Sequence, residues 1–291
     1  MHAGGRSPDR SKQRAILTPL DTAQGPARRS PGVAHASVAL PLVGALCVFA
    51  WLALAVWSAS PWRRLLDHGG WSDLAWLAAL CRAVPAGDVV VPALAYALAW
   101  LLMIAAMMLP TTLPLLALFR RIVASRSDAG ALVALVTLGY AVAWLGFGVA
   151  AYGIDAAVRA AVAQSGWLVA HGWVAGSVVI AGAGAFQFSA LKYRCLERCR
   201  TPFGFVNAHW RGRHPRRESF ALGLVHGLFC VGCCWALMLV TFVVGMGSIG
   251  WMLILAAAMA AEKNLPWGAR LRTPLGVALL AWGTGIAVVN A

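Results

Sequence analysis

Long uninterrupted apolar runs, separated by short polar connections, dominate the hydrophobic pattern of this chain. Several runs exceed the roughly 20 residues that an α-helix needs to cross a bilayer. Apolar and polar residues do not alternate within the runs, which argues against a transmembrane β-barrel. The pattern therefore predicts an all-α fold, a polytopic helical membrane bundle. We expect seven spans, at about 37–60, 89–118, 130–152, 171–191, 220–245, 249–262 and 274–291.

The sixth run is the shortest, so six spans are the alternative to seven. Pro110 interrupts the second run and removes the amide hydrogen that would bond to the carbonyl of Ala106, so a kink is expected there. Gly223 and Gly227 in the fifth run are small residues four apart, a spacing that lets membrane helices approach closely.

The first 36 residues differ from the rest of the chain. They are rich in Arg, Pro, Gly and Ser and lack apolar periodicity, which predicts a disordered, basic, cytoplasmic tail at 1–36 before a transmembrane domain at 37–291. A cleaved signal peptide is the alternative, since Ser58-Ala59-Ser60 fits a cleavage pattern. The apolar run is too long for that, and the leader before it is too extended.

Composition supports the membrane interpretation, and charge gives it a direction. Sixty per cent of the 291 residues are hydrophobic and 12% are charged, whereas a soluble domain carries about 25% charged residues. The net charge of +14 does not indicate nucleic-acid binding, because the basic residues lie mainly in connections with little aromatic interleaving. With a cytoplasmic N-terminus, 20 of the 24 Lys and Arg fall on the inner side, as the positive-inside rule predicts for a cytoplasmic-membrane protein.

Candidate chemistry concentrates in one stretch of the fifth run, His226-Gly-Leu-Phe-Cys230-Val-Gly-Cys233-Cys234. Offsets of four, seven and eight residues on an α-helix place the imidazole and three thiols within an arc of roughly 100°. A buried cysteine by itself is often an inert hydrophobe, and we assign Cys47 and Cys81 to that class. Four ligand-type side chains on one face predict a soft-metal site instead.

The predicted topology brings further ligand-type side chains to the same half of the membrane, from three other spans. Cys195 and Cys199, four residues apart, are expected to share one helical face where the fourth span ends. Thiolates and thioethers favour Cu(I), and thiolates with imidazole also suit zinc, so copper is the preferred metal and zinc the alternative. Glu262 either forms an ion pair with Lys263 or attracts an incoming cation. The candidate metal ligands are His226, Cys230, Cys233, Cys234, Cys195, Cys199, Met107, Met108 and Glu262.

Several motifs together resemble a bacterial family of predicted metal-binding integral membrane proteins, long known as a domain of unknown function. They are Ala106-Met-Met-Leu-Pro-Thr111, Gln187-Phe188 with Cys195-x-x-x-Cys199, the His226–Trp235 stretch and Glu262-Lys263. The resemblance covers roughly residues 90–290. One member is described as a copper chaperone for a tyrosinase. The resemblance thus implies a multi-pass protein of the bacterial inner membrane that delivers copper to a cuproenzyme such as a tyrosinase-like oxidase.

Two other functions fit parts of the pattern. Cys230-x-x-Cys233 is the spacing of a redox pair, so a membrane thiol–disulfide oxidoreductase is one alternative. The pair lies deep in an apolar span, however, and of the seven cysteines only Cys81 is predicted on the outer side. The other alternative is a scaffold for a partner enzyme, with inert cysteines. Copper binding and handover without catalysis remains the main hypothesis.

Overall fold

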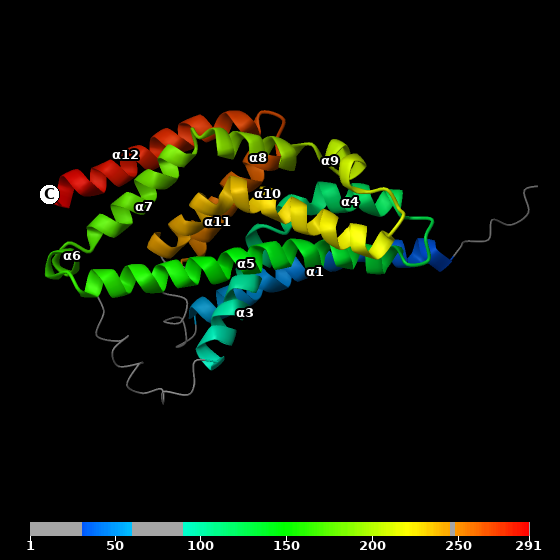
Figure 1. Ribbon diagram of the computed structural model, residues 1–291, viewed down its shortest axis with the longest axis horizontal. Coiled ribbons are helices and arrows are strands. Elements are labelled where there is room, and N and C mark those ends of the chain that lie inside the picture. The colour runs from blue at the N-terminus through cyan, green and yellow to red at the C-terminus, as the bar shows by residue number, and fades with distance from the viewer. Residues whose placement is uncertain (1–30, 60–89, 245–247, 291) are drawn as a thin grey trace, which may run out of the picture. The chain divides into compact units, whose positions relative to one another are not determined.

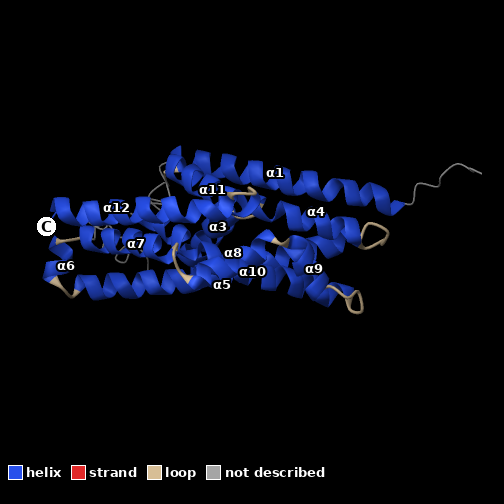
Figure 2. Ribbon diagram, turned by 90° about the horizontal axis from the view of Figure 1, so that it is seen from above, coloured by secondary structure: helices blue, strands red, loops and turns tan. Residues whose placement is uncertain are grey.

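The structure is a computed structural model that describes residues 31–59, 90–244 and 248–290, and every regular element in these ranges is helical. Figure 2 shows helices joined by loops throughout this part of the chain. The elements are α1 (Pro31–Ala59), α3 (Val90–Met107), η2 (Pro110–Thr112), α4 (Leu113–Ile122), α5 (Ala129–Ala163), α6 (Gly166–Ala170), α7 (Trp173–Phe186), α8 (Ala190–Arg200), α9 (Pro202–His209), α10 (Pro215–Val244), α11 (Ile249–Asn264), η3 (Gly268–Leu271) and α12 (Arg272–Asn290).

Within the described residues, four helical stretches are long and apolar enough to cross a membrane: Pro41–Ala59, Ala129–Ala163, Pro215–Val244 and Gly268–Asn290. The number rises to six if each of two bent helix pairs counts as one span. The all-α prediction is thus confirmed for these ranges, and seven spans and a cytoplasmic N-terminus stay predictions. α11, which corresponds to the expected sixth span, has only 16 residues, about 24 Å of helix.

The kink expected at Pro110 is confirmed. α3 ends at Met107, and the segment that begins at Pro110 is bent from it by 46°. The carbonyl of Ala106, which has no amide partner at Pro110, accepts a hydrogen bond from the indole nitrogen of Trp51 at 3.0 Å. Because Trp51 belongs to α1, the first helix packs over the break and satisfies its unpaired backbone oxygen.

The helices α5 and α10 run side by side and form the central contact of the bundle (Figure 1). A Cβ at Gly223 would collide with the backbone of Val136 on α5, and one at Gly227 would lie 2.6 Å from the Ala143 Cβ. The predicted close approach at these two glycines is therefore confirmed. Tyr140 lies between these two contacts on α5 and so faces the α10 motif.

The expected fourth span is broken in the structure. The pair Trp173–Phe186 and Ala190–Arg200 is bent by 63°. Ser189 begins α8 by accepting a hydrogen bond from the Lys192 amide at 3.1 Å, an N-cap that starts a new helix. The bend turns α8 against α10, which is what carries the two cysteines of α8 towards the central motif.

Other boundaries differ from the sequence-based expectations. α1 begins at Pro31, within the predicted tail, and α5 continues to Ala163, well past the expected end at 152. The basic segment expected as a loop after residue 191 contains α8 and α9, because Ser189 and Pro202 each provide a helix start. Residues 1–30, Cys81 and the expected turn at 245–247 lie outside the described residues.

Candidate metal centre

Three cysteine sulfurs form a row between α8 and α10. The Sγ of Cys199 lies 3.9 Å from that of Cys233, which in turn lies 3.5 Å from that of Cys234. Cys233 also donates to the carbonyl of Cys230 at 3.2 Å. Cys233 and Cys234 are each 1% exposed, whereas Cys199 is only partly buried. This thiol row, Cys199–Cys233–Cys234, therefore leads from a partly exposed sulfur into the interior.

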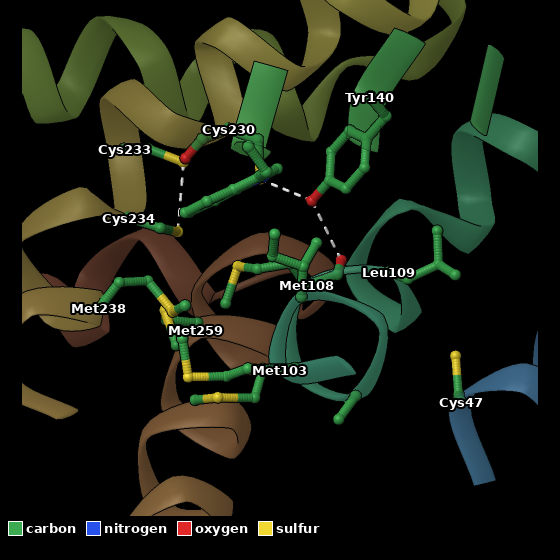
Figure 3. Packing of buried hydrophobic residues seen from close by; sticks show 14 of the residues in the cluster. Cys47, Met103, Met108, Leu109, Tyr140, Cys230, Cys233, Cys234, Met238 and Met259 are labelled. Atoms are coloured by element: carbon green, nitrogen blue, oxygen red, sulfur yellow. Dashed lines mark hydrogen bonds between the residues drawn. The ribbon is translucent and has the colours of Figure 1, made fainter. Parts of the chain in front are cut away.

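Cys230 begins a polar network of its own. Its sulfur lies 3.0 Å from the Tyr140 hydroxyl (Figure 3), and the ammonium of Lys263 donates to it at 2.8 Å. Lys263 also donates to the Thr111 hydroxyl at 3.2 Å. All four side chains are buried. Side chains of α5 and α11 thus meet α10 at one sulfur atom, and Lys263 links it to the η2 turn.

Met108 is tied to this network through its backbone. Its carbonyl accepts hydrogen bonds from the Thr111 hydroxyl at 2.7 Å and the Tyr140 hydroxyl at 3.3 Å. The same oxygen also accepts from the Thr111 amide at 3.1 Å, so three donors converge on it at the break in the helix. Met107 and Met108 are 1% and 0% exposed, so both predicted thioether ligands lie in the core.

His226 lies on the α10 face that meets α5, and the structure does not join it to the thiols by a hydrogen bond. Its ring packs against those of Tyr140 and Phe205, at centroid distances of 6.1 and 5.2 Å. Its Nδ1 is buried and has no hydrogen-bond partner in the described residues. Together with Thr112, His226 also lines a small cavity that has room for about one water molecule.

The expected ion pair between Glu262 and Lys263 is wrong. Glu262 accepts instead from the ammonium of Lys192 at 2.6 Å, in a pair whose side chains are 1% and 0% exposed. Consecutive residues point about 100° apart on a helix, so Glu262 faces α8 while Lys263 faces Cys230. One Glu262 oxygen, Oε1, has no hydrogen-bond partner among the described residues.

Cys195 packs directly against α10. A Cβ added at Gly232 would lie 2.6 Å from the Cys195 sulfur, so the absence of a side chain at Gly232 makes room for the thiol. The expected common face of Cys195 and Cys199 is thus turned towards α10, next to Cys233. Cys47 is buried in α1, outside this region.

The sulfur atoms lie one after another in space and do not surround a common point. Within the described ranges, no three His, Cys, Asp or Glu side chains are placed to bind one metal ion. The thiol row offers pairs of neighbouring sulfurs, and the softness of sulfur matches Cu(I). Such pairs suit an ion that moves by exchanging one ligand at a time.

Sequence reasoning overlooked Tyr140 and Lys192 as partners of the predicted site. Tyr140 was one aromatic residue in a span of Ala, Val and Gly, and Lys192 was counted with the basic connection. An ionisable residue beside an apolar span is a signal that Lys192 belongs inside the bundle. The contact of Tyr140 had no comparable signal, because it follows from the approach of α5 to α10.

A comparison with known protein families decides the affiliation. The model of the PpoB2 copper chaperone family matches residues 97–286, well over half of the chain. The chain belongs to the PpoB2 copper chaperone family. All nine predicted ligands fall within the matched PpoB2 region, and the suspected family is confirmed. Searches of curated proteins and of solved structures gave no match.

Proposed function

We propose that this protein is an integral membrane protein that binds Cu(I) and hands it to a client cuproenzyme, such as a tyrosinase-like oxidase. Membership of the PpoB2 copper chaperone family gives the copper-related role. The thiol row is the observation that carries the rest of the proposal, because neighbouring sulfurs at 3.9 and 3.5 Å connect a partly exposed cysteine with two buried ones.

In this proposal Cys199 receives or releases the ion at the surface, with Cys195 beside it. Cys233 and Cys234 hold the ion in the interior, and Cys230 completes the thiol set. His226, Met107 and Met108 provide neutral ligands. The ring of His226 packs against Tyr140, and the carbonyl of Met108 accepts from the Tyr140 hydroxyl. Glu262 is the least supported of the predicted ligands, since Lys192 occupies one of its oxygens.

The charge of the site suits a monovalent ion. Cu(I) held by two thiolates carries one negative charge in total, and an uncompensated charge in a membrane interior is costly. The ammonium of Lys263, 2.8 Å from the Cys230 sulfur, brings the sum to zero. A divalent ion such as zinc with two thiolates is already neutral and would leave Lys263 uncompensated. The arrangement thus supports copper over zinc.

The oxidoreductase alternative has less support. A redox pair must reach a partner thiol or quinone, and Cys230 and Cys233 are 0% and 1% exposed. Among the described cysteines of α8 and α10, only Cys199 is more than slightly exposed. A chaperone that exchanges ligands needs no such access at Cys230.

Metal analysis of detergent-purified protein tests the proposal. After loading with Cu(I) under anaerobic, reducing conditions, we expect the wild type to retain copper and the Cys230→Ser/Cys233→Ser variant to lose most of it. Cys47→Ser is the matched control, because Cys47 is a buried cysteine outside the thiol row, and it should retain copper. Equal copper content in the wild type and the double variant would overturn the proposed site. Quinone reduction that requires Cys230 and Cys233, in protein without copper, would favour the oxidoreductase.

A further inference from the structure

The buried methionines are a second sulfur-rich feature of the bundle, and the proposed function uses only two of them. The six methionines of the described residues are all at most 1% exposed. Four belong to one region next to the thiols and are called here the thioether cluster: Met103, Met108, Met238 and Met259.

The thioether cluster draws on three helices. Met103 belongs to α3, Met238 to α10 and Met259 to α11, and α11 contacts both of the other helices. Figure 3 shows the side chains of these three residues pointing towards one another, with Met108 beside them. All four are 0% exposed, so their sulfurs are shielded from solvent.

The thioether cluster continues the thiol row. Met238 follows Cys234 by four residues on α10 and therefore lies on the same helical face, one turn further along. Figure 3 shows Cys234 between Cys233 and the methionines. The helix register and Figure 3 thus place Met238 next after Cys199, Cys233 and Cys234 in the order of sulfur-bearing residues.

Packing does not by itself require methionine at these four positions. Methionine fills irregular gaps well, yet leucine is the commoner choice in a helix interface. Leu237 of α10 and Leu255 of α11 are buried leucines that pack in this way. Thioethers are neutral, soft ligands that bind Cu(I) and do not suit zinc. Three of them from three helices form a ligand set that adds no charge to the interior.

We propose that Met103, Met238 and Met259, with Met108 beside them, form a second Cu(I) site that receives the ion from Cys234. This inference rests on the proposed function, since the thiol row supplies the ion. The step exchanges a copper–thiolate bond for a copper–thioether bond, and copper remains Cu(I). The Cys234 thiolate left behind keeps its negative charge one helical turn from the ion and is free to bind the next Cu(I).

Silver binding separates this second site from the thiols, because Ag(I) is a soft monovalent ion like Cu(I) but is not oxidised in air. We expect the Met103→Leu/Met238→Leu/Met259→Leu variant to bind about one Ag(I) per chain fewer than the wild type. Leucine preserves volume and apolar character, so the core should tolerate it. Met252→Leu is the matched control, a buried methionine of α11 outside the cluster, and should bind as the wild type does.

The Cys230→Ser/Cys233→Ser variant distinguishes the two proposals. If it loses silver while the leucine variant binds as the wild type does, the thiol site stands and the thioether site is wrong. If neither variant loses silver, both are wrong. Selenomethionine-labelled Met107→Leu/Met108→Leu protein provides a second test, since X-ray absorption at the copper edge should still show a selenium neighbour from Met103, Met238 or Met259. Only lighter sulfur neighbours would contradict the thioether site.

Discussion

Two lysines in the described part of the chain are buried, and they differ in what neutralises them. Lys192 donates to the Glu262 carboxylate at 2.6 Å, whereas Lys263 donates to the Cys230 sulfur at 2.8 Å and the Thr111 hydroxyl at 3.2 Å. Within the described residues, Lys263 has no carboxylate partner. A carboxylate neutralises its lysine permanently, but a thiol carries either a proton or a metal.

Under the proposed function, the difference separates a lysine that holds the fold from one that supports metal binding. The Lys192–Glu262 pair joins α8 to α11, and Arg200 of α8 also donates to the carbonyls of Glu262 and Leu265 at the end of α11. These contacts fix the helix that carries Cys195 and Cys199. Lys263, by contrast, contacts Cys230, and under the proposed function it balances the charge of the thiolates that bind copper. Two lysines that are both buried therefore lead to different expectations on substitution.

The largest effect is expected from breaking the structural pair. Lys192→Met leaves the Glu262 carboxylate buried without a cation and should lower the free energy of unfolding by about 3–5 kcal/mol. Denaturant unfolding in detergent, followed by circular dichroism, measures the change. The Lys192→Met/Glu262→Met variant should recover most of the loss, because both charges are removed together. Equal stability of the single and double variants would mean that the pair does not hold α8.

The next effect concerns metal binding. Lys263→Met removes the charge that balances a copper–thiolate complex and should weaken Cu(I) binding about 10–100-fold, the usual effect of losing a group that supports a metal ligand. Competition with a Cu(I) chelator measures the affinity. Lys263→Arg keeps the charge and should lose less. Unchanged affinity in Lys263→Met would show that Lys263 resembles Lys192 and has only a structural role.

The smallest effect is expected at an ion pair near the surface. Arg126 and Asp128 lie 2.8 Å apart with side chains 39% and 28% exposed, and exposed pairs add little to stability. Arg126→Gln should leave the unfolding midpoint unchanged at neutral pH. The hydrogen bond from Arg126 lowers the pKa of Asp128, so any stabilisation is present at neutral pH and is lost as the pH falls through that pKa. A shift as large as that of Lys192→Met would show that burial is not the deciding difference.

Helical periodicity predicted much of the candidate site. The offsets in the His226–Cys234 stretch placed four side chains on one α10 face, and the spacing of Cys195 and Cys199 placed both on one face of α8. The i to i+4 geometry of a helix depends on local hydrogen bonds alone. The sequence was therefore sufficient to predict which side chains share a helical face. The kink at Pro110 could be predicted from the sequence for the same reason, because a missing amide hydrogen is a local property.

Contacts between side chains of different helices could not be predicted from local spacing. The pairing of Glu262 with Lys192, and of Lys263 with Cys230, depends on how α8 and α11 meet α10. In the sequence, Met238 and Met259 are isolated methionines in apolar runs. Their proximity to Met103 is seen only in the tertiary structure. Such contacts join positions far apart in the chain, and a small change in the angle of a helix bend would pair different side chains.

The sequence by itself determined the all-α class, the long apolar helices and the two helical faces that carry cysteine. Its composition and local spacing suffice for these, since membrane crossing and helix geometry are properties of single segments. Only the tertiary structure decided that the Cys199 sulfur lies next to that of Cys233. It also decided that Tyr140 and Lys263 both contact Cys230, and that four methionines lie beside Cys234. The 63° break before α8 and the close approach of α5 to α10 made those contacts, and both depend on packing between segments.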